Sequence, residues 1–108
     1  MRDEIAIRQL ESVPEFEACV QMQTQVWGFA DRDLVPRRMF VVANKIGGHV
    51  LGGWDGDRLA GFCLALPGRR DDLAYWHSHM TAVAEPYRNL GLGKRLKFAQ
   101  REAALQRG

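Results

Sequence analysis

Apolar and polar positions follow two different periods along the first quarter of the chain, and these periods predict its first two elements. Residues 4–10 alternate between apolar and polar side chains, as a half-buried strand does. Ser12–Glu15 fits a capping box, in which a serine hydroxyl and a glutamate carboxylate bind the free amides at a helix start. Gly28 is placed to end that helix. One face of the helix carries Phe16, Cys19, Val20, Gln23 and Trp27.

A second helix is predicted from Pro36, because the fixed φ of proline suits a first helical turn. It ends at the two glycines of residues 47–48. One side of it carries Met39, Ala43 and Ile46. Residues 49–68 then hold two apolar runs around Asp55-Gly56, a dipeptide that favours a hairpin turn.

The last third of the chain predicts one more strand and one more helix. Residues 73–83 are rich in aromatic and β-branched side chains, as strands are. From Gly91 the period becomes helical, and one face of this helix carries Leu92, Leu96, Ala99 and Ala103. The order strand, helix, helix, three strands, helix predicts an α+β fold with a mostly antiparallel sheet.

Composition narrows the class of protein without naming a function. Of the 108 residues, 46% are hydrophobic and 26% are charged, which is ordinary for a globular domain, and a net charge of +2 is too mild to indicate a nucleic-acid partner. Cys19 and Cys63 stand in apolar surroundings and read as buried thiols of a reducing compartment. Neither a signal peptide nor a membrane span is recognisable, so we expect a cytoplasmic domain that does not bind membranes.

Candidate chemistry gathers in Pro86–Lys97, "PYRNLGLGKRLK". A strand that ends at Val83 and a helix that starts near Gly91 leave the first helical amides without partners, and the helix dipole adds partial positive charge there. Gly91 and Gly93 let a bulky anion approach the backbone, and Arg88 and Lys94 add charge. This arrangement favours a phosphate or pyrophosphate.

Two common phosphate motifs do not fit this loop. A P-loop needs Ser or Thr after its lysine, where this chain has Arg95, and the dinucleotide fingerprint needs a small residue at Leu96. The run Arg88–Gly93 matches R-x-x-G-x-G, which resembles the coenzyme A pyrophosphate motif, Q/R-x-x-G-x-G/A, of the GCN5-related N-acetyltransferases (GNAT). The longer runs Thr81–Gly93 and Trp54–Phe62 are similar to the family's strand with Pro-Tyr and to its Asp-Gly hairpin.

The resemblance implies an acyl-CoA N-acyltransferase (GNAT) fold and acetyl-CoA as co-substrate. The central strand would splay from its neighbour, and its backbone would pair with the pantetheine arm at Thr81, Ala82 and Val83. The pyrophosphate would lie against the motif. Its residues here are Arg88, Asn89, Leu90, Gly91, Leu92, Gly93 and Lys94.

The reaction implied is direct attack of a primary amine on the thioester, with the acceptor unknown. A lysine-like amine is almost entirely protonated at pH 7, so a base or a path to water is needed. His77 and His79 are the titratable candidates, and two residues apart they share a strand face. By its spacing from Arg88, His77 falls where a histone-acetylating branch of the family keeps a glutamate base. The backbone amide of Val83 would bind the developing oxyanion.

Structural alternatives stand beside each of these roles. Either histidine is also explained as a hydrogen-bonded structural residue, and H-x-H with His49 is a weakly supported zinc set, so no metal is predicted. Arg37 and Arg38 fit a substrate mouth, a nucleotide 3′-phosphate or a solvated helix face. The three tryptophans are assigned to the core: Trp27, Trp54 and Trp76.

Residues 1–108 are expected to be the amino-terminal part of a family domain, without the later strands and helix and without the tyrosine acid that often follows them. Phe98 and Leu105 lie away from the apolar stripe of the last helix, so further elements or a second copy would cover them. The leading prediction is an N-acetyltransferase. Truncation of the domain would be a reason for residues 1–108 to be inactive on their own. The alternatives are a CoA-binding or self-associating half-domain without turnover and a fragment without ligand. An exposed strand edge also suggests a homodimer.

Overall fold

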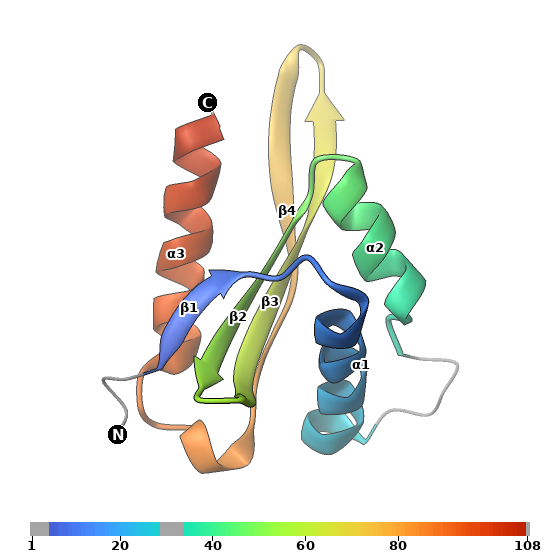
Figure 1. Cartoon of the computed structure of the whole chain (residues 1–108). Coiled ribbons are helices and arrows are strands. Elements are labelled where there is room, and N and C mark those ends of the chain that lie inside the picture. Colours follow the sequence, from blue (N-terminus) through green and yellow to red (C-terminus); the bar gives the residue numbers. More distant parts are fainter. Residues whose placement is uncertain (1–4, 29–33, 108) are drawn as a thin grey trace.

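In the computed structural model, which describes residues 5–28 and 34–107, four strands form one antiparallel sheet in the order β1-β2-β3-β4. Figure 1 shows α1 and α2 on one side of this sheet and α3 on the other. The predicted element order and the α+β class are confirmed. The elements are β1 (Ala6–Gln9), α1 (Val13–Trp27), α2 (Arg37–Lys45), β2 (His49–Asp55), β3 (Arg58–Arg70), β4 (Leu73–Val83), the 3₁₀ turn η3 (Glu85–Tyr87) and α3 (Leu92–Arg107).

Helix α1 begins and ends where the sequence predicts. The hydroxyl of Ser12 accepts from the amide of Glu15 at 3.3 Å, and the Glu15 carboxylate accepts from the amide of Ser12 at 3.1 Å, which completes the capping box. Gly28 ends the helix in the left-handed region, at φ 64°. The helix is therefore set by local contacts that sequence alone specifies.

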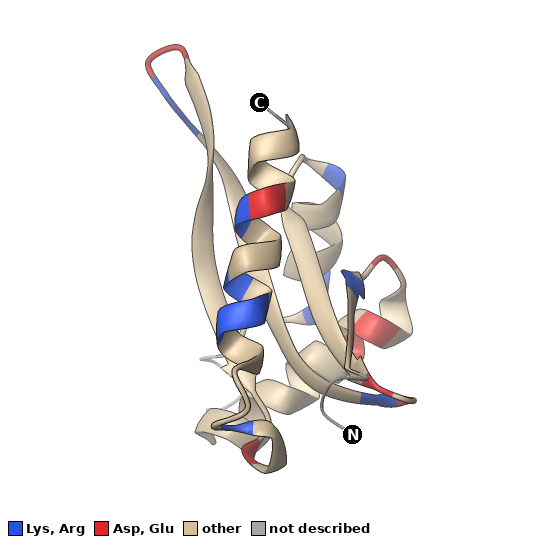
Figure 2. Ribbon diagram, turned by 90° about the vertical axis from the view of Figure 1, so that its left-hand side faces the viewer, with Lys and Arg blue, Asp and Glu red and all other residues tan. Residues whose placement is uncertain are grey.

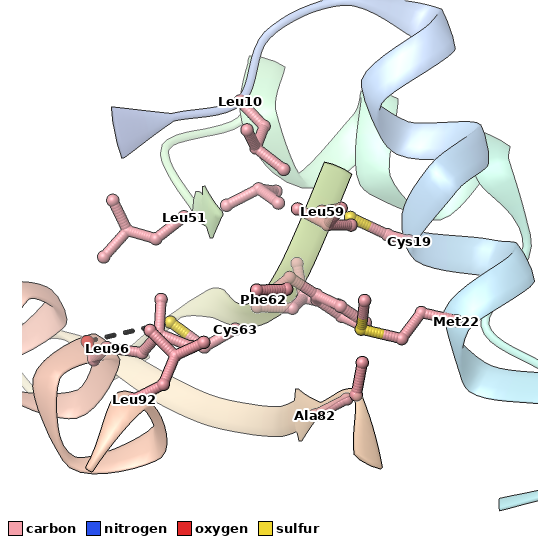
Figure 3. Close-up of a cluster of buried hydrophobic side chains, with 14 of the residues drawn as sticks. Leu10, Cys19, Met22, Leu51, Leu59, Phe62, Cys63, Ala82, Leu92 and Leu96 are labelled. Carbon is pink, nitrogen blue, oxygen red and sulfur yellow. Dashed lines mark hydrogen bonds between the residues drawn. The ribbon is translucent and has the colours of Figure 1, made fainter. Parts of the chain in front are cut away.

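The core under α1 and α2 is built on aromatic rings. The ring of Phe40 lies between those of Phe16 and Phe62, with centroids 6.0 and 5.8 Å apart. Figure 3 shows the Phe62 side of this cluster, with Cys19 and Met22 reaching in from α1. Burying one such ring stabilises the fold by about 2 kcal/mol, so this face holds both helices on the sheet.

Helix α3 packs closely on the opposite face because two glycines leave room for it. A Cβ at Gly53 would meet Leu92 at 2.9 Å, and one at Gly61 would meet Leu92 at 3.2 Å and Leu96 at 3.3 Å. Both leucines are buried. The thiol of Cys63 donates to the carbonyl of Leu96 at 3.9 Å (Figure 3). The start of α3 is thus seated against the β2–β3 hairpin.

Strand β4 contains a bulge that alternation in the sequence does not reveal. Leu64 pairs with Met80 and Ala65 pairs with Ser78, so His79 has no partner residue in β3. A regular strand would place His77 on the same face as Thr81. The extra residue instead moves His77 to the face of α1 and α2, because it pairs there with Leu66.

Several side-chain placements differ from the predicted pattern. Trp27, predicted in the core, is 40% exposed, while Trp54 is half-buried against the core. Helix α2 buries Phe40 and Ala43, whereas the predicted face wrongly grouped Ala43 with Met39 and Ile46, which are both exposed. A nine-residue helix has too few turns for its period to identify the buried side.

No helix among the described residues is long and apolar enough to cross a membrane.

Both cysteines are buried and free, as predicted. Burial raises the pKa of the Cys63 thiol to about 11 and raises that of Cys19 further. Neither thiol is therefore a nucleophile at neutral pH.

Candidate acyl-CoA site

The glycine-rich loop is a backbone turn that opens onto the start of α3. Asn89 and Gly91 both take positive φ, at 68° and 78°, and the first helical bond runs from the amide of Arg95 to the carbonyl of Gly91 at 3.0 Å. The amides of residues 92–94 lie ahead of that bond and have no acceptor four residues back. The end of α3 therefore presents three backbone donors at the positive end of its dipole.

The loop also has room for a bulky anion. A Cβ at Gly91 would meet nothing within 4 Å, and one at Gly93 would meet only Val83, at 3.6 Å. Gly91 is required by its positive φ, whereas the fold would accept alanine at position 93. This difference agrees with a motif whose last position is Gly or Ala.

Basic side chains surround the loop and continue along the helix. Figure 2 shows blue bands along α3 from the loop upward, the last of them beside a red band. The first ten positions of α3 include Lys94, Arg95, Lys97 and Arg101. The Arg88 guanidinium donates through Nε to the carbonyl of Val83 at 3.2 Å, which holds this cation beside the strand end. These cations complement a ligand that carries several negative charges.

Strand β4 lies at the edge of the sheet, and its backbone groups alternate between β3 and the open side. The amide of Ala84 donates to the carbonyl of Ala60 at 2.8 Å, and the carbonyl of Ala82 lies toward Gly61. Ala82 therefore faces β3, and the backbones of Thr81 and Val83 face the open edge. Of the three residues predicted to pair with pantetheine, these two direct their backbone groups outward, although the carbonyl of Val83 already accepts from Arg88 Nε.

The side chains beside this edge come from α3 and β4 together. Lys97 Nζ donates to the hydroxyl of Ser78, and Thr81 Oγ1 is buried without a hydrogen-bond partner among the described residues. The sequence assigned Lys97 to the outer side of the helix. Nothing in a single sequence identifies its contact with β4, because that contact depends on how α3 crosses the sheet.

The two histidines lie together at the bulge, with ring centroids 5.8 Å apart, and both are exposed. His79 is two residues from Thr81 and four from Val83, which correspond to about 7 and 14 Å along a strand. His77 lies on the sheet face opposite α3. The structure thus brings the loop and Val83 together and leaves the histidines farther up the same strand.

His49 does not join this pair. It is buried, and its ring stacks on Trp76 at 4.8 Å, while Trp76 Nε1 donates to the carbonyl of Gly47 at 2.8 Å. Over residues 5–28 and 34–107, no three His, Cys, Asp or Glu side chains gather as a metal site would require. Arg37 and Arg38 lie at the start of α2, where Arg37 is 3.7 Å from Glu17.

Comparison with known proteins extends this picture to the whole chain. The fold matches an aminoglycoside acetyltransferase, meta-AAC0020, from an uncultured soil metagenomic sample, in complex with sisomicin, with a TM-score of 0.85 and 14% identity over 98% of this chain and 73% of that one. It also matches the ribosomal-protein-S18-alanine N-acetyltransferase of Escherichia coli, with a TM-score of 0.72 and 17% identity over 96% and 61% of the two chains.

A third similar structure is a GNAT family acetyltransferase from Staphylococcus aureus, with a TM-score of 0.71 and 16% identity over 94% of this chain and 78% of that one. At such identities the likeness shows the fold and not the substrate. Among curated proteins, none matches the sequence. The model of the acetyltransferase (GNAT) family, however, matches residues 7–108. The chain therefore belongs to the GNAT acetyltransferase family, as its R-x-x-G-x-G loop predicts.

Proposed function

We propose that this acetyltransferase binds acetyl-CoA along the open edge of β4 and transfers the acetyl group to a primary amine by direct attack on the thioester. The observation that carries the proposal is the open end of α3 beside that edge. The amides of residues 92–94 and the side chains of Arg88 and Lys94 would hold the pyrophosphate. The outward backbones of Thr81 and Val83 would pair with the pantetheine arm, as an added strand does.

In this proposal the backbone would supply the polar group that the reaction needs at the thioester. Negative charge would grow on the thioester oxygen as the amine attacks, and an outward amide of β4 would donate to it. Val83 is the residue named by the family resemblance. Thr81 presents the same group closer to the histidines, and a base and an oxyanion donor must flank one reacting carbon. We therefore propose Thr81 as the donor, with Val83 bound to the arm.

His79 or His77 would take the proton of the attacking amine. Both are exposed, and an imidazole nitrogen is able to accept a proton directly or through water. His79 is closer to Thr81, and His77 lies on the face of α1 and α2, from which an acceptor would approach without crossing α3.

That this domain extends beyond residue 108 and that it is cytoplasmic stay predictions.

A calorimetric titration of this chain with acetyl-CoA tests the proposal. Gly91→Glu places bulk and negative charge at the loop, so we expect acetyl-CoA affinity to fall by at least about tenfold, the equivalent of 1.4 kcal/mol. Gly93→Ala is the matched control, because its Cβ meets only Val83 at contact distance. Gly91→Ala separates the strain of positive φ from the effect of charge.

Wild-type binding that is lost in Gly91→Glu and retained in Gly93→Ala supports the site. Equal binding by wild type and Gly91→Glu contradicts it.

The alternative function is a half-domain that binds CoA or associates with itself without turnover. Two apolar side chains on α3 favour the self-association: Phe98 and Leu105 are 55% and 60% exposed. Release of free CoA upon addition of amines, together with the mass from light scattering, separates the two functions.

A further inference from the structure

The residue directly before the glycine-rich loop is tied to a distant hairpin. Tyr87 Oη donates to Asp55 Oδ2 at 2.5 Å, and the guanidinium carbon of Arg58 lies 5.4 Å from the centre of the Tyr87 ring. Asp55 and Arg58 flank the β2–β3 turn, which Figure 1 shows next to the orange 3₁₀ turn that ends in Tyr87. Tyr87 is buried, so the contact joins two loops across a packed boundary.

The chemistry of this contact makes it stronger than an ordinary surface bond. A phenol that donates to a carboxylate forms a short, charge-assisted hydrogen bond. Its hydrogen bond to Asp55 and its burial raise the pKa of Tyr87, so the phenol keeps its proton throughout the neutral range. Arg58 opposes that shift but holds the ring from its face.

The loop that follows needs such support. Asn89 takes a left-handed φ of 68°, a conformation that asparagine adopts more readily than other non-glycine residues but that contacts around the loop must still hold in place. At its far end the loop is held by Leu92, which is buried against Gly53 of β2. At its near end the neighbouring contact is the one between Tyr87 and Asp55, also of β2. Both ends of the loop are therefore fixed to the same strand, two residues apart.

We infer that Asp55 and Tyr87 are positioning residues, which hold the glycine-rich loop so that the amides of residues 92–94 converge on the pyrophosphate of the bound acyl-CoA. The inference rests on the proposed function for its ligand. Its structural part, that a hairpin carboxylate sets the conformation of the loop, is independent of any ligand. Affinity for CoA then depends on Asp55, which lies outside the R-x-x-G-x-G motif.

Tyr87→Phe tests this by removing one hydroxyl and leaving the ring. Tyr75→Phe is the matched control, because Tyr75 is the other tyrosine of the chain and is 49% exposed at the far end of β4. Amide hydrogen exchange is measured without ligand at the hydrogen-bonded amides beside the loop, Tyr87, Arg88 and Arg95. The affinity for CoA is measured by calorimetry.

In Tyr87→Phe we expect exchange at these amides to rise about tenfold while exchange in α1 stays unchanged, and CoA affinity to fall about tenfold. Tyr75→Phe should change neither. Unchanged loop exchange and unchanged affinity in Tyr87→Phe would overturn the inference. Equal acceleration in α1 would also overturn it, because the bond would then support the whole fold and not the loop.

Substitution of the carboxylate gives a second, independent readout. Asp55→Asn keeps an acceptor oxygen for the phenol and should retain most of the affinity, whereas Asp55→Ala should match Tyr87→Phe. Asp55→Ala combined with Tyr87→Phe should be no weaker than either alone, since both remove one bond. If wild type fails to bind CoA while Tyr87→Phe still loosens the loop, the proposed function fails and the positioning role stands.

Discussion

The C-terminal end of β4 and its middle belong to one strand but differ in the groups that they offer to a reaction. The C-terminal end, Thr81–Val83, offers backbone: alternate amides and carbonyls face the open edge, beside the start of α3. The middle, His77–His79, offers side chains, and the bulge at His79 decides which face His77 and Ser78 take. A site made of backbone depends on strand and loop conformation, whereas a site made of side chains depends on one inserted residue.

This difference explains why the C-terminal end is recognisable as a motif and the middle is not. Backbone donors require only glycines and a strand-to-helix turn, which leave a pattern in the sequence at Gly91 and Gly93. A general base requires a titratable group at a particular place. The sequence does not distinguish His77 from His79 in this role, because the two residues are neighbours on the same strand. Variants that change one of these two parts of β4 and leave the other intact test the distinction.

The largest effect is expected from removing a backbone donor at the loop end. Thr81→Pro deletes an amide that faces away from β3, so the ladder to β3 is kept and we expect turnover with acetyl-CoA and an amine acceptor to fall about 10²–10³-fold. Steady-state kinetics and thermal unfolding are measured on the same protein. The control is Ala82→Pro, which removes an amide that faces β3 and should instead lower the unfolding temperature.

Val83→Pro sharpens the same experiment. If Val83 only binds the arm, its substitution should raise KM for acetyl-CoA and change kcat little. A larger loss of kcat in Val83→Pro than in Thr81→Pro would place the oxyanion contact at Val83 and not at Thr81.

The next largest effect is expected at the two histidines in the middle of β4. Replacing His77 and His79 together by alanine should lower turnover about 10²-fold at pH 7 while acetyl-CoA affinity stays within about twofold, because the cofactor contacts are elsewhere. The single variants identify the base as the one whose loss removes the acidic limb of the pH–rate profile. Full activity in the double variant would assign both histidines a structural role.

The smallest effect on the candidate site is expected from a change at Glu15 in α1, which should alter stability and leave both parts of β4 unaffected. Burial raises the pKa of Glu15, but hydrogen bonds from the Glu11 amide, the Arg8 guanidinium and the Ser12 amide outweigh it and lower the pKa from 4.5 to about 2. The unfolded chain therefore binds the proton more tightly than the folded chain does, so this stabilisation is present above pH 4.5 and is lost as pH falls toward 2.

Glu15→Gln should therefore lower the free energy of unfolding at pH 7 by about 1 kcal/mol, and the difference from wild type should vanish near pH 2. Thermal unfolding across this pH range is the measurement. Acetyl-CoA affinity at pH 7 should be unchanged in this variant. A difference in stability that persists at pH 2 would mean that the carboxylate's charge is not what stabilises the helix start.

Features that neighbouring residues control are predictable from the amino-acid sequence. The capping box of Ser12 and Glu15, the left-handed Gly28, the hairpin turn after Asp55 and the start of α3 all depend on contacts within a few positions. The glycine-rich loop belongs to this class, because positive φ at Gly91 and free amides after it follow from local conformation. Local free energies of this kind are set before any distant segment is in place.

Other features depend on contacts between distant segments and are visible only in the folded chain. Two contacts join segments far apart in the chain: Lys97 with Ser78, and Asp55 with Tyr87. The burial of Phe40 and the exposure of Trp27 depend on how the helices pack on the sheet. The bulge that moves His77 to the other face depends on how β4 pairs with β3. The two contacts depend on how closely α3 and the hairpins approach, which Gly53 and Gly61 permit but do not specify. Close packing fixes such contacts cooperatively, so no single stretch of sequence carries them.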